Sequence, residues 1–184
     1  MIEVLTTFHK PGWEQYGKRM VETFLQYWPA DIKIHLYCEN VSTGLNDTRV
    51  VEHDIFAVCP QAKNFVAAHN NDYNNGIRHG VRDFKYDAIK FCYKVFAQCH
   101  RIKNSEADTL IFLDADTVTF AEPPVEKLMD LLPDDNFTAY IGRPNNKKLP
   151  FAETGYIMYN LKHPNTINFA DVFEDLYTTG KVFD

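Results

Sequence analysis

The chain has 184 residues, of which 45% are hydrophobic and 24% charged, as is typical of one globular domain rather than a disordered segment. Its formal net charge of −6 argues against nucleic acid or an anionic membrane as a partner, because both require a basic surface. No stretch approaches the roughly 20 apolar residues of a membrane span, and residues 1–8 do not resemble a signal peptide.

The four cysteines are scattered and form no C-x-x-C pair, which argues against a zinc or redox site. We expect them to be buried thiols that serve as small hydrophobic side chains, and we expect a reducing, cytoplasmic location. They are Cys38, Cys59, Cys92 and Cys99.

In chain order, the hydrophobic pattern first predicts a buried strand over residues 2–7. An amphipathic helix follows over 13–28, with Pro11-Gly12 as the turn before it and Pro29 as its end. Two further strands are predicted over 32–37 and 49–52. Residues 60–83 show no clear period, so we expect a long surface loop there, with a short helix near 62–69.

Beyond this loop, the pattern predicts a helix over 86–102 and then the most apolar run of the chain, a central strand over 109–113. The remaining predicted elements are a short helix over 124–132, strands over 137–141 and 155–159, and a helix over 165–177. This alternation of strands and helices predicts an α/β fold with a Rossmann-like, mostly parallel central sheet flanked by helices. Ligands of such sheets bind at the carboxyl ends of the strands.

Two aspartates, Asp114 and Asp116, follow the predicted central strand directly. In an extended chain, positions i and i+2 point the same way, so we expect the two carboxylates to lie close together. A hard divalent cation relieves the repulsion between such groups, and Mg²⁺ or Mn²⁺ keeps coordination positions open for substrate phosphates. An acidic, solvated turn is the structural alternative.

The segment Leu110-Ile-Phe-Leu-Asp114-Ala-Asp116 resembles the DxD motif of the GT-A type nucleotide-sugar glycosyltransferases. Phe151-Ala-Glu153-Thr-Gly155-Tyr-Ile-Met-Tyr-Asn160 is similar to the segment that follows this motif in many members, and residues 4–8 with the helix and strand up to Glu39 are similar to their first βαβ unit. The resemblance implies a GT-A (nucleotide-diphospho-sugar transferase) fold. It further implies one glycosyltransferase-like domain over residues 1–184, without the C-terminal segment from which many members supply a third metal ligand.

By this resemblance, the chain is a hexosyltransferase-like enzyme that moves a sugar from a nucleoside-diphosphate sugar, with a UDP-sugar expected, to a hydroxyl group of a glycan or other acceptor. Asp114 and Asp116 would bind Mn²⁺ or Mg²⁺, with Asp116 as the main ligand and Asp114 facing the ribose or the metal. Glu153 would orient or deprotonate the acceptor hydroxyl. Further donor contacts are expected from Thr6, Thr7, Lys90 and Lys94, with Arg82 and Arg78 of the long loop clamping the diphosphate.

The threonines, the lysines and Glu153 also have a structural explanation. The threonines and Glu153 suit hydrogen bonds at strand ends, and the lysines suit a solvated helix face. Two other functions also fit the acidic pair. In a haloacid dehalogenase-like phosphatase, Asp114 would be the phosphorylated nucleophile and Asp116 the general acid, although that motif normally lies near the amino terminus. The second alternative function is a non-catalytic domain that binds a nucleotide sugar.

Overall fold

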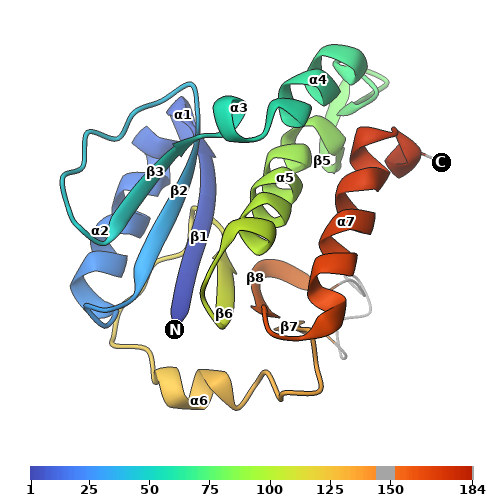
Figure 1. Cartoon of the computed structure of the whole chain (residues 1–184). Coiled ribbons are helices and arrows are strands. Elements are labelled where there is room, and N and C mark those ends of the chain that lie inside the picture. Colours follow the sequence, from blue (N-terminus) through green and yellow to red (C-terminus); the bar gives the residue numbers. More distant parts are fainter. Residues whose placement is uncertain (144–151, 184) are drawn as a thin grey trace.

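The structure is a computed structural model, and it describes residues 1–143 and 152–183. At its centre is a six-stranded sheet in the order β3-β2-β1-β6-β8-β7 (Figure 1). The parallel part consists of β3 (Val50–Asp54), β2 (Lys33–Glu39), β1 (Ile2–His9) and β6 (Thr109–Leu113). β8 (Glu153–Asn160) runs antiparallel to both β6 and the edge strand β7 (Thr138–Ile141). The predicted α/β fold with a mostly parallel sheet is therefore confirmed.

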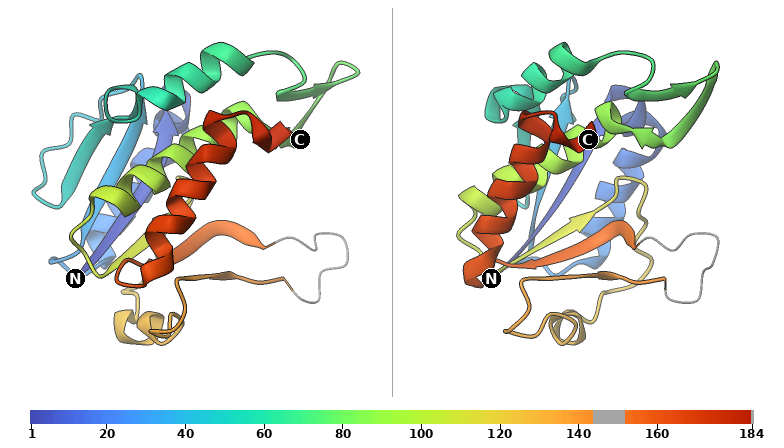
Figure 2. Two further views of the ribbon diagram at one scale, coloured as in Figure 1. Left: turned by 45° about the vertical axis from the view of Figure 1, so that its right-hand side comes forward. Right: turned by 90° about the vertical axis from the view of Figure 1, so that its right-hand side faces the viewer.

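Helices cover both faces of this sheet (Figures 1 and 2). On one face lie the short α1 (Lys10–Gly12), a π-helical turn η1 (Trp13–Gly17), α2 (Lys18–Tyr27) and α6 (Val125–Met129). On the other lie α3 (Ile55–Val58), α4 (Pro60–His69), α5 (Ala88–Asn104) and α7 (Pro164–Thr178), and a 3₁₀ turn η2 (Lys181–Phe183) follows α7. In both views of Figure 2, α5 and α7 lie side by side.

Strand β1 shows why the sheet needs helices on both sides. Its side chains alternate between two buried clusters: Val4 and Phe8 pack with α2, whereas Leu5 packs with α5 and α7. A strand covered on both faces loses nearly all contact with water, and Val4 and Leu5 are both completely buried. Its carboxyl end, Thr7 to His9, forms part of the cleft described below.

The short helix predicted near residues 62–69 is confirmed by α4 (Pro60–His69). The rest of the long loop predicted over 60–83 is wrong, because an antiparallel hairpin of β4 (Asn75–Arg78) and β5 (Val81–Asp87) occupies most of it. The hairpin turn is His79-Gly80, and both residues have positive φ, the conformation that the tightest hairpin turns require. These strands escaped the sequence analysis because they pair only with each other and carry few apolar residues.

The first helix also begins earlier than predicted. Pro11 and Gly12 belong to α1 rather than to a preceding turn, because proline is compatible with the first turn of a helix. The four cysteines are free and buried as expected, and burial raises the pKa of Cys38, Cys59 and Cys99 to about 12. Within residues 1–143 and 152–183, no helix has the length and apolar character needed to cross a bilayer.

A buried polar cluster lies between α5 and the sheet. Arg101 Nε donates to Glu3 Oε2 at 2.8 Å, and Ser105 Oγ donates to the same oxygen at 2.7 Å. His35 Nδ1 lies 2.9 Å from His53 Nε2. Burial lowers the pKa of His53 to about 4, and the positive charges around it act in the same direction. This histidine is therefore neutral in the folded protein near pH 7.

Candidate functional site

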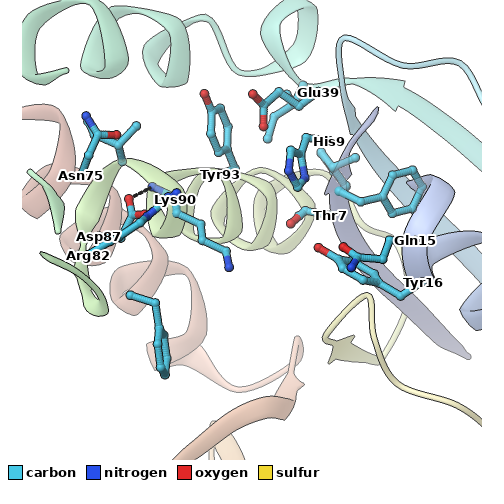
Figure 3. A pocket seen from close by; sticks show the side chains of 15 residues that line it. Thr7, His9, Gln15, Tyr16, Glu39, Asn75, Arg82, Asp87, Lys90 and Tyr93 are labelled. Atoms are coloured by element: carbon cyan, nitrogen blue, oxygen red, sulfur yellow. Dashed lines mark hydrogen bonds and ion pairs between the residues drawn. The ribbon is translucent and has the colours of Figure 1, made fainter. Parts of the chain in front are cut away.

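A cleft with two connected lobes opens at the carboxyl ends of β1, β2 and β6. We call the first the large lobe, a cavity of about 520 Å³, and the second the acidic lobe, of about 310 Å³. Thr7, Tyr16, Phe84 and Lys90 line both, so the lobes form one cleft. Figure 3 shows the large lobe, where Lys90 of α5 lies across the cavity from Gln15 and Tyr16 of the π-helical turn.

The acidic lobe contains both aspartates of the predicted metal site. β6 ends at Leu113, and the chain then turns, because Thr117 N donates to the carbonyl oxygen of Asp114 at 3.0 Å. Asp114 and Asp116 reach the same lobe through this turn, not through the extended chain that the sequence suggested. The carboxylate of Asp116 is exposed to the lobe.

Lys94 supplies a counter-charge to the first aspartate. Its Nζ lies 2.7 Å from Asp114 Oδ1, and it also lies 4.6 Å from the centre of the Phe112 ring. The Lys94 side chain is 13% exposed, whereas that of Asp114 is 40% exposed. One oxygen of Asp114 is thus paired within the protein, and the carboxylate still faces the cleft.

Gly155 brings β8 close to the other oxygen of Asp114. Asp114 N donates to Gly155 O at 2.8 Å. A Cβ on Gly155 would lie 2.9 Å from Asp114 Oδ2 and 3.2 Å from Glu153 Oε1. Glycine is therefore the residue that leaves space for the Asp114 carboxylate at this point.

Tyr16, which lies within the amphipathic helix predicted over residues 13–28, is a cleft residue. Burial raises its pKa, and the negative charges of Asp116 and Asp114 raise it further, so its hydroxyl lies in their field. Tyr16 belongs to the π-helical turn, which shifts the helix face relative to the α-helical pattern. A Cβ on Gly12 would lie 2.7 Å from the Tyr16 hydroxyl, so glycine leaves space for this side chain as well.

The large lobe combines a half-buried carboxylate with basic side chains. Burial raises the pKa of Glu39, and the effect is reduced by His9 and by a hydrogen bond with Tyr93. At the opposite side, Arg82 Nη2 pairs with Asp87 Oδ2 at 2.5 Å (Figure 3). Asp87 is buried and also caps α5 by accepting from Lys90 N at 2.8 Å. This arrangement fixes the hairpin and the start of α5 on one wall of the lobe.

Of the predicted site residues, the structure brings together Thr7, Arg82, Lys90, Lys94, Asp114 and Asp116. It does not bring Thr6 into the cleft: alternation along β1 turns its side chain to the other face, where it is fully buried. Arg78 lines a separate cavity on the other side of the hairpin. Glu153 forms an ion pair with Arg143, and its Oε1 accepts from Gly155 N at 3.0 Å. Phe151, the first residue of the Glu153 segment, lies outside the described residues.

The carboxylate oxygens of the acidic lobe are ligand atoms of the type that a hard divalent cation prefers. Two carboxylates open onto the lobe, and Mg²⁺ is commonly held by one or two carboxylates plus water and substrate phosphates. In the described part of the chain, no group of three or more acidic, histidine or cysteine side chains is placed to bind a metal. His163, the only histidine after the acidic pair, caps α7 by accepting from Asn165 N at 3.1 Å.

Comparison with known proteins gives no match to a family profile and none to a curated protein sequence. Solved structures do match. Mouse xyloside xylosyltransferase 1 superposes with a TM-score of 0.59 at 14% identity, covering 98% of this chain and 74% of that chain. The GlyE glycosyltransferase of Streptococcus pneumoniae gives a TM-score of 0.55 at 12% identity, covering 96% of this chain and 38% of that chain.

The galactosyltransferase LgtC, solved with donor and acceptor sugar analogues, gives a TM-score of 0.53 at 10% identity and covers 96% of this chain and 65% of that chain. This chain has the GT-A glycosyltransferase fold. The fold predicted from the resemblance is therefore confirmed. At these identities the likeness establishes the fold alone, and the chain spans only part of the length of each of these proteins.

Proposed function

We propose that this chain binds a nucleoside-diphosphate sugar, expected to be a UDP-sugar, and transfers the sugar to a hydroxyl group of a glycan or another acceptor. The observation that carries the proposal is the position of Asp114 and Asp116. Both open onto a cleft at the carboxyl edge of β1 and β6, in a fold shared with glycosyltransferases. This edge is where open α/β sheets bind their ligands.

Each lobe suits a different part of the donor molecule. The large lobe has the size of a small-molecule site, and Thr7 and Glu39 offer it oxygen atoms that accept hydrogen bonds from a base or ribose. Lys90, which lines both lobes, and Arg82 supply positive charge for the diphosphate between them. The acidic lobe then receives the end of the diphosphate and the sugar, with Mn²⁺ or Mg²⁺ held by Asp114 and Asp116.

In the proposed reaction, the acceptor oxygen bonds to the anomeric carbon as the bond from that carbon to the diphosphate oxygen breaks. The hydroxyl proton leaves to a base. A bound divalent cation supplies Lewis-acid neutralisation of the charge on the leaving diphosphate. Lys90 and Arg82 add to this electrostatic stabilisation, and Lys94 holds Asp114 in position through its ion pair.

Glu153 remains our prediction for the base, and both of its oxygens are engaged, one by Arg143 and one by Gly155 N. To accept a proton from the acceptor, Glu153 must first lose its ion pair with Arg143. Glu153→Gln tests the assignment: it should lower kcat while leaving nucleotide binding unchanged.

The test of the proposed function is product formation. The protein is incubated with Mn²⁺, a panel of UDP-sugars and simple glycosides, and both UDP release and the new glycoside are measured. We expect a glycoside that depends on Mn²⁺ and is lost in Asp116→Asn. Nucleotide binding without product from any acceptor would instead indicate a binding domain. Covalent labelling of Asp114 by beryllofluoride would indicate the phosphatase.

A further inference from the structure

A second cavity, of about 270 Å³, lies on the other side of the β4–β5 hairpin from the large lobe. Its walls come from the hairpin, the start of α5 and the end of α7 with η2, which approach one another in Figure 1. Arg78 and Lys85 line it, and its described lining residues include no aspartate or glutamate. On a chain with a net charge of −6, this is a locally basic cavity.

Arg78 is held in this cavity by two tyrosine rings. Its guanidinium carbon lies 4.2 Å from the ring centre of Tyr73 and 4.2 Å from that of Tyr86. With two rings this close to the guanidinium carbon, the N–H donors are the groups of Arg78 that remain for other partners. Among residues 1–143 and 152–183, Arg78 has no ion-pair partner, and its buried Nε has no hydrogen-bond partner. The guanidinium is thus fixed in place, and its charge is unmatched by any described carboxylate.

The other walls are aromatic. Phe91, Tyr177 and Phe183 line the cavity, and the residues Tyr73 and Tyr86 are 60% and 53% exposed. Such walls suit the apolar face of a ring-shaped ligand, and a few polar groups then fix its orientation. A guanidinium edge binds a carboxylate or a phosphate through two parallel hydrogen bonds. The aromatic walls and the guanidinium together suit a sugar ring that carries an anionic group.

The cavity also adjoins the proposed transfer site. Phe91 lines both this cavity and the acidic lobe, so one side chain forms the wall between them. A saccharide whose hydroxyl lies in the acidic lobe can extend past Phe91 to the guanidinium of Arg78. We propose that this cavity, which we call the Arg78 cavity, binds an anionic sugar unit of the acceptor. The inference rests on the proposed function, because it takes the ligand to be part of the acceptor.

The experiment measures sugar binding without donor or metal. Four probes are titrated in ¹H–¹⁵N NMR spectra: methyl glucuronide, glucose 6-phosphate, uncharged methyl glucoside, and inorganic phosphate. We expect one of the two anionic sugars to bind at least about tenfold more tightly than the glucoside and the phosphate. Which of them binds distinguishes a carboxylate from a phosphate as the anionic group. The largest shifts should fall on Phe91, Tyr177 and Phe183.

Arg78→Met removes the charge and keeps the length of the side chain, and we expect it to weaken this binding about tenfold. Arg19→Met, at an exposed position of α2 that lines neither lobe nor the Arg78 cavity, is the matched control and should leave it unchanged. Shift mapping of the unmodified protein provides a second readout that does not depend on the fold of a variant. Equal binding of the glucoside, equal binding of inorganic phosphate, or shifts elsewhere in the protein would overturn the inference. UDP titrated in parallel reports on the proposed function separately.

Discussion

The ion pair between Lys94 and Asp114 makes a prediction that couples stability to metal binding. Lys94→Met keeps the buried aliphatic part of the side chain and removes the ammonium group that lies 2.7 Å from Asp114 Oδ1. Asp114 then stands in the acidic lobe with Asp116 and without its counter-charge. We therefore expect the variant to be less stable when no divalent cation is present, and to recover when Mn²⁺ replaces the missing charge.

The magnitude follows from the distance and the exposure of the pair. Two unit charges 2.7 Å apart attract by about 1.5 kcal/mol at the dielectric constant of water and by several times more inside a protein. Because the Asp114 side chain is 40% exposed, screening and the cost of desolvating Lys94 hold the net value near the lower figure. We expect a loss of about 1–2 kcal/mol in the free energy of unfolding, or a fall in Tm of about 3–6 °C.

The assay is thermal and urea unfolding of both proteins, without divalent cation and with saturating Mn²⁺. Removal of the ammonium frees Asp114 Oδ1, so the variant should bind Mn²⁺ more tightly than the unmodified protein does. With Mn²⁺, the variant's loss in unfolding free energy should therefore be less than half of the loss measured without Mn²⁺. Lys90→Met, one turn earlier on α5, is the matched control and should show neither effect. A deficit of the same size with and without Mn²⁺ would refute the idea that the ammonium and the metal share the Asp114 carboxylate.

Three further predictions follow from individual contacts. Gly155→Ala places a Cβ 2.9 Å from Asp114 Oδ2, so Mn²⁺-dependent nucleotide binding should weaken at least about tenfold. Unchanged nucleotide binding in calorimetry would contradict the close approach of Gly155 to this carboxylate. Thr7→Val should weaken UDP binding, whereas Thr6→Val should leave it unchanged. The Thr6→Val substitution should also stabilise the fold by up to about 1 kcal/mol, because the Thr6 hydroxyl is buried with no hydrogen-bond partner in the described residues. The pKa of His53 is about 4 in the folded protein and about 6.5 when exposed, so protonation favours unfolding and stability should fall by about 1–2 kcal/mol between pH 7 and pH 5. His53→Gln should flatten this dependence in urea titrations, and an unaltered slope would show that another group causes it.

The sequence predicted the elements whose hydrophobic pattern is long or strong. The central strand over 109–113 agrees with β6 at both ends, and the last helix differs from α7 by one residue at each end. The β4–β5 hairpin was missed because it lies outside the main sheet and has little apolar periodicity. Its turn, His79-Gly80, was the available signal, although histidine is not among the residues most typical of such turns.

Part of the candidate site, like part of the fold, could be predicted from the sequence. Aspartates after an apolar strand and lysines on the preceding helix could be read from residue type and spacing. The 2.7 Å contact between Lys94 and Asp114 could not, because it depends on how α5 packs on the sheet. Tyr16 and Glu39 were not predicted as cleft residues. A π-helical turn directs the first, and β2 had to extend two residues beyond its predicted end to bring the second to the cleft.

The central claim is that Asp114 and Asp116 hold a divalent cation that binds the donor diphosphate. Calorimetric titration of UDP into the protein, with and without Mn²⁺, tests it most directly when the unmodified protein and Asp116→Asn are compared. We expect Mn²⁺-dependent UDP binding in the unmodified protein and a loss of at least about tenfold in the variant, with thermal unfolding of the metal-free proteins little changed. Equal UDP affinity in both proteins, or affinity independent of Mn²⁺, would contradict it.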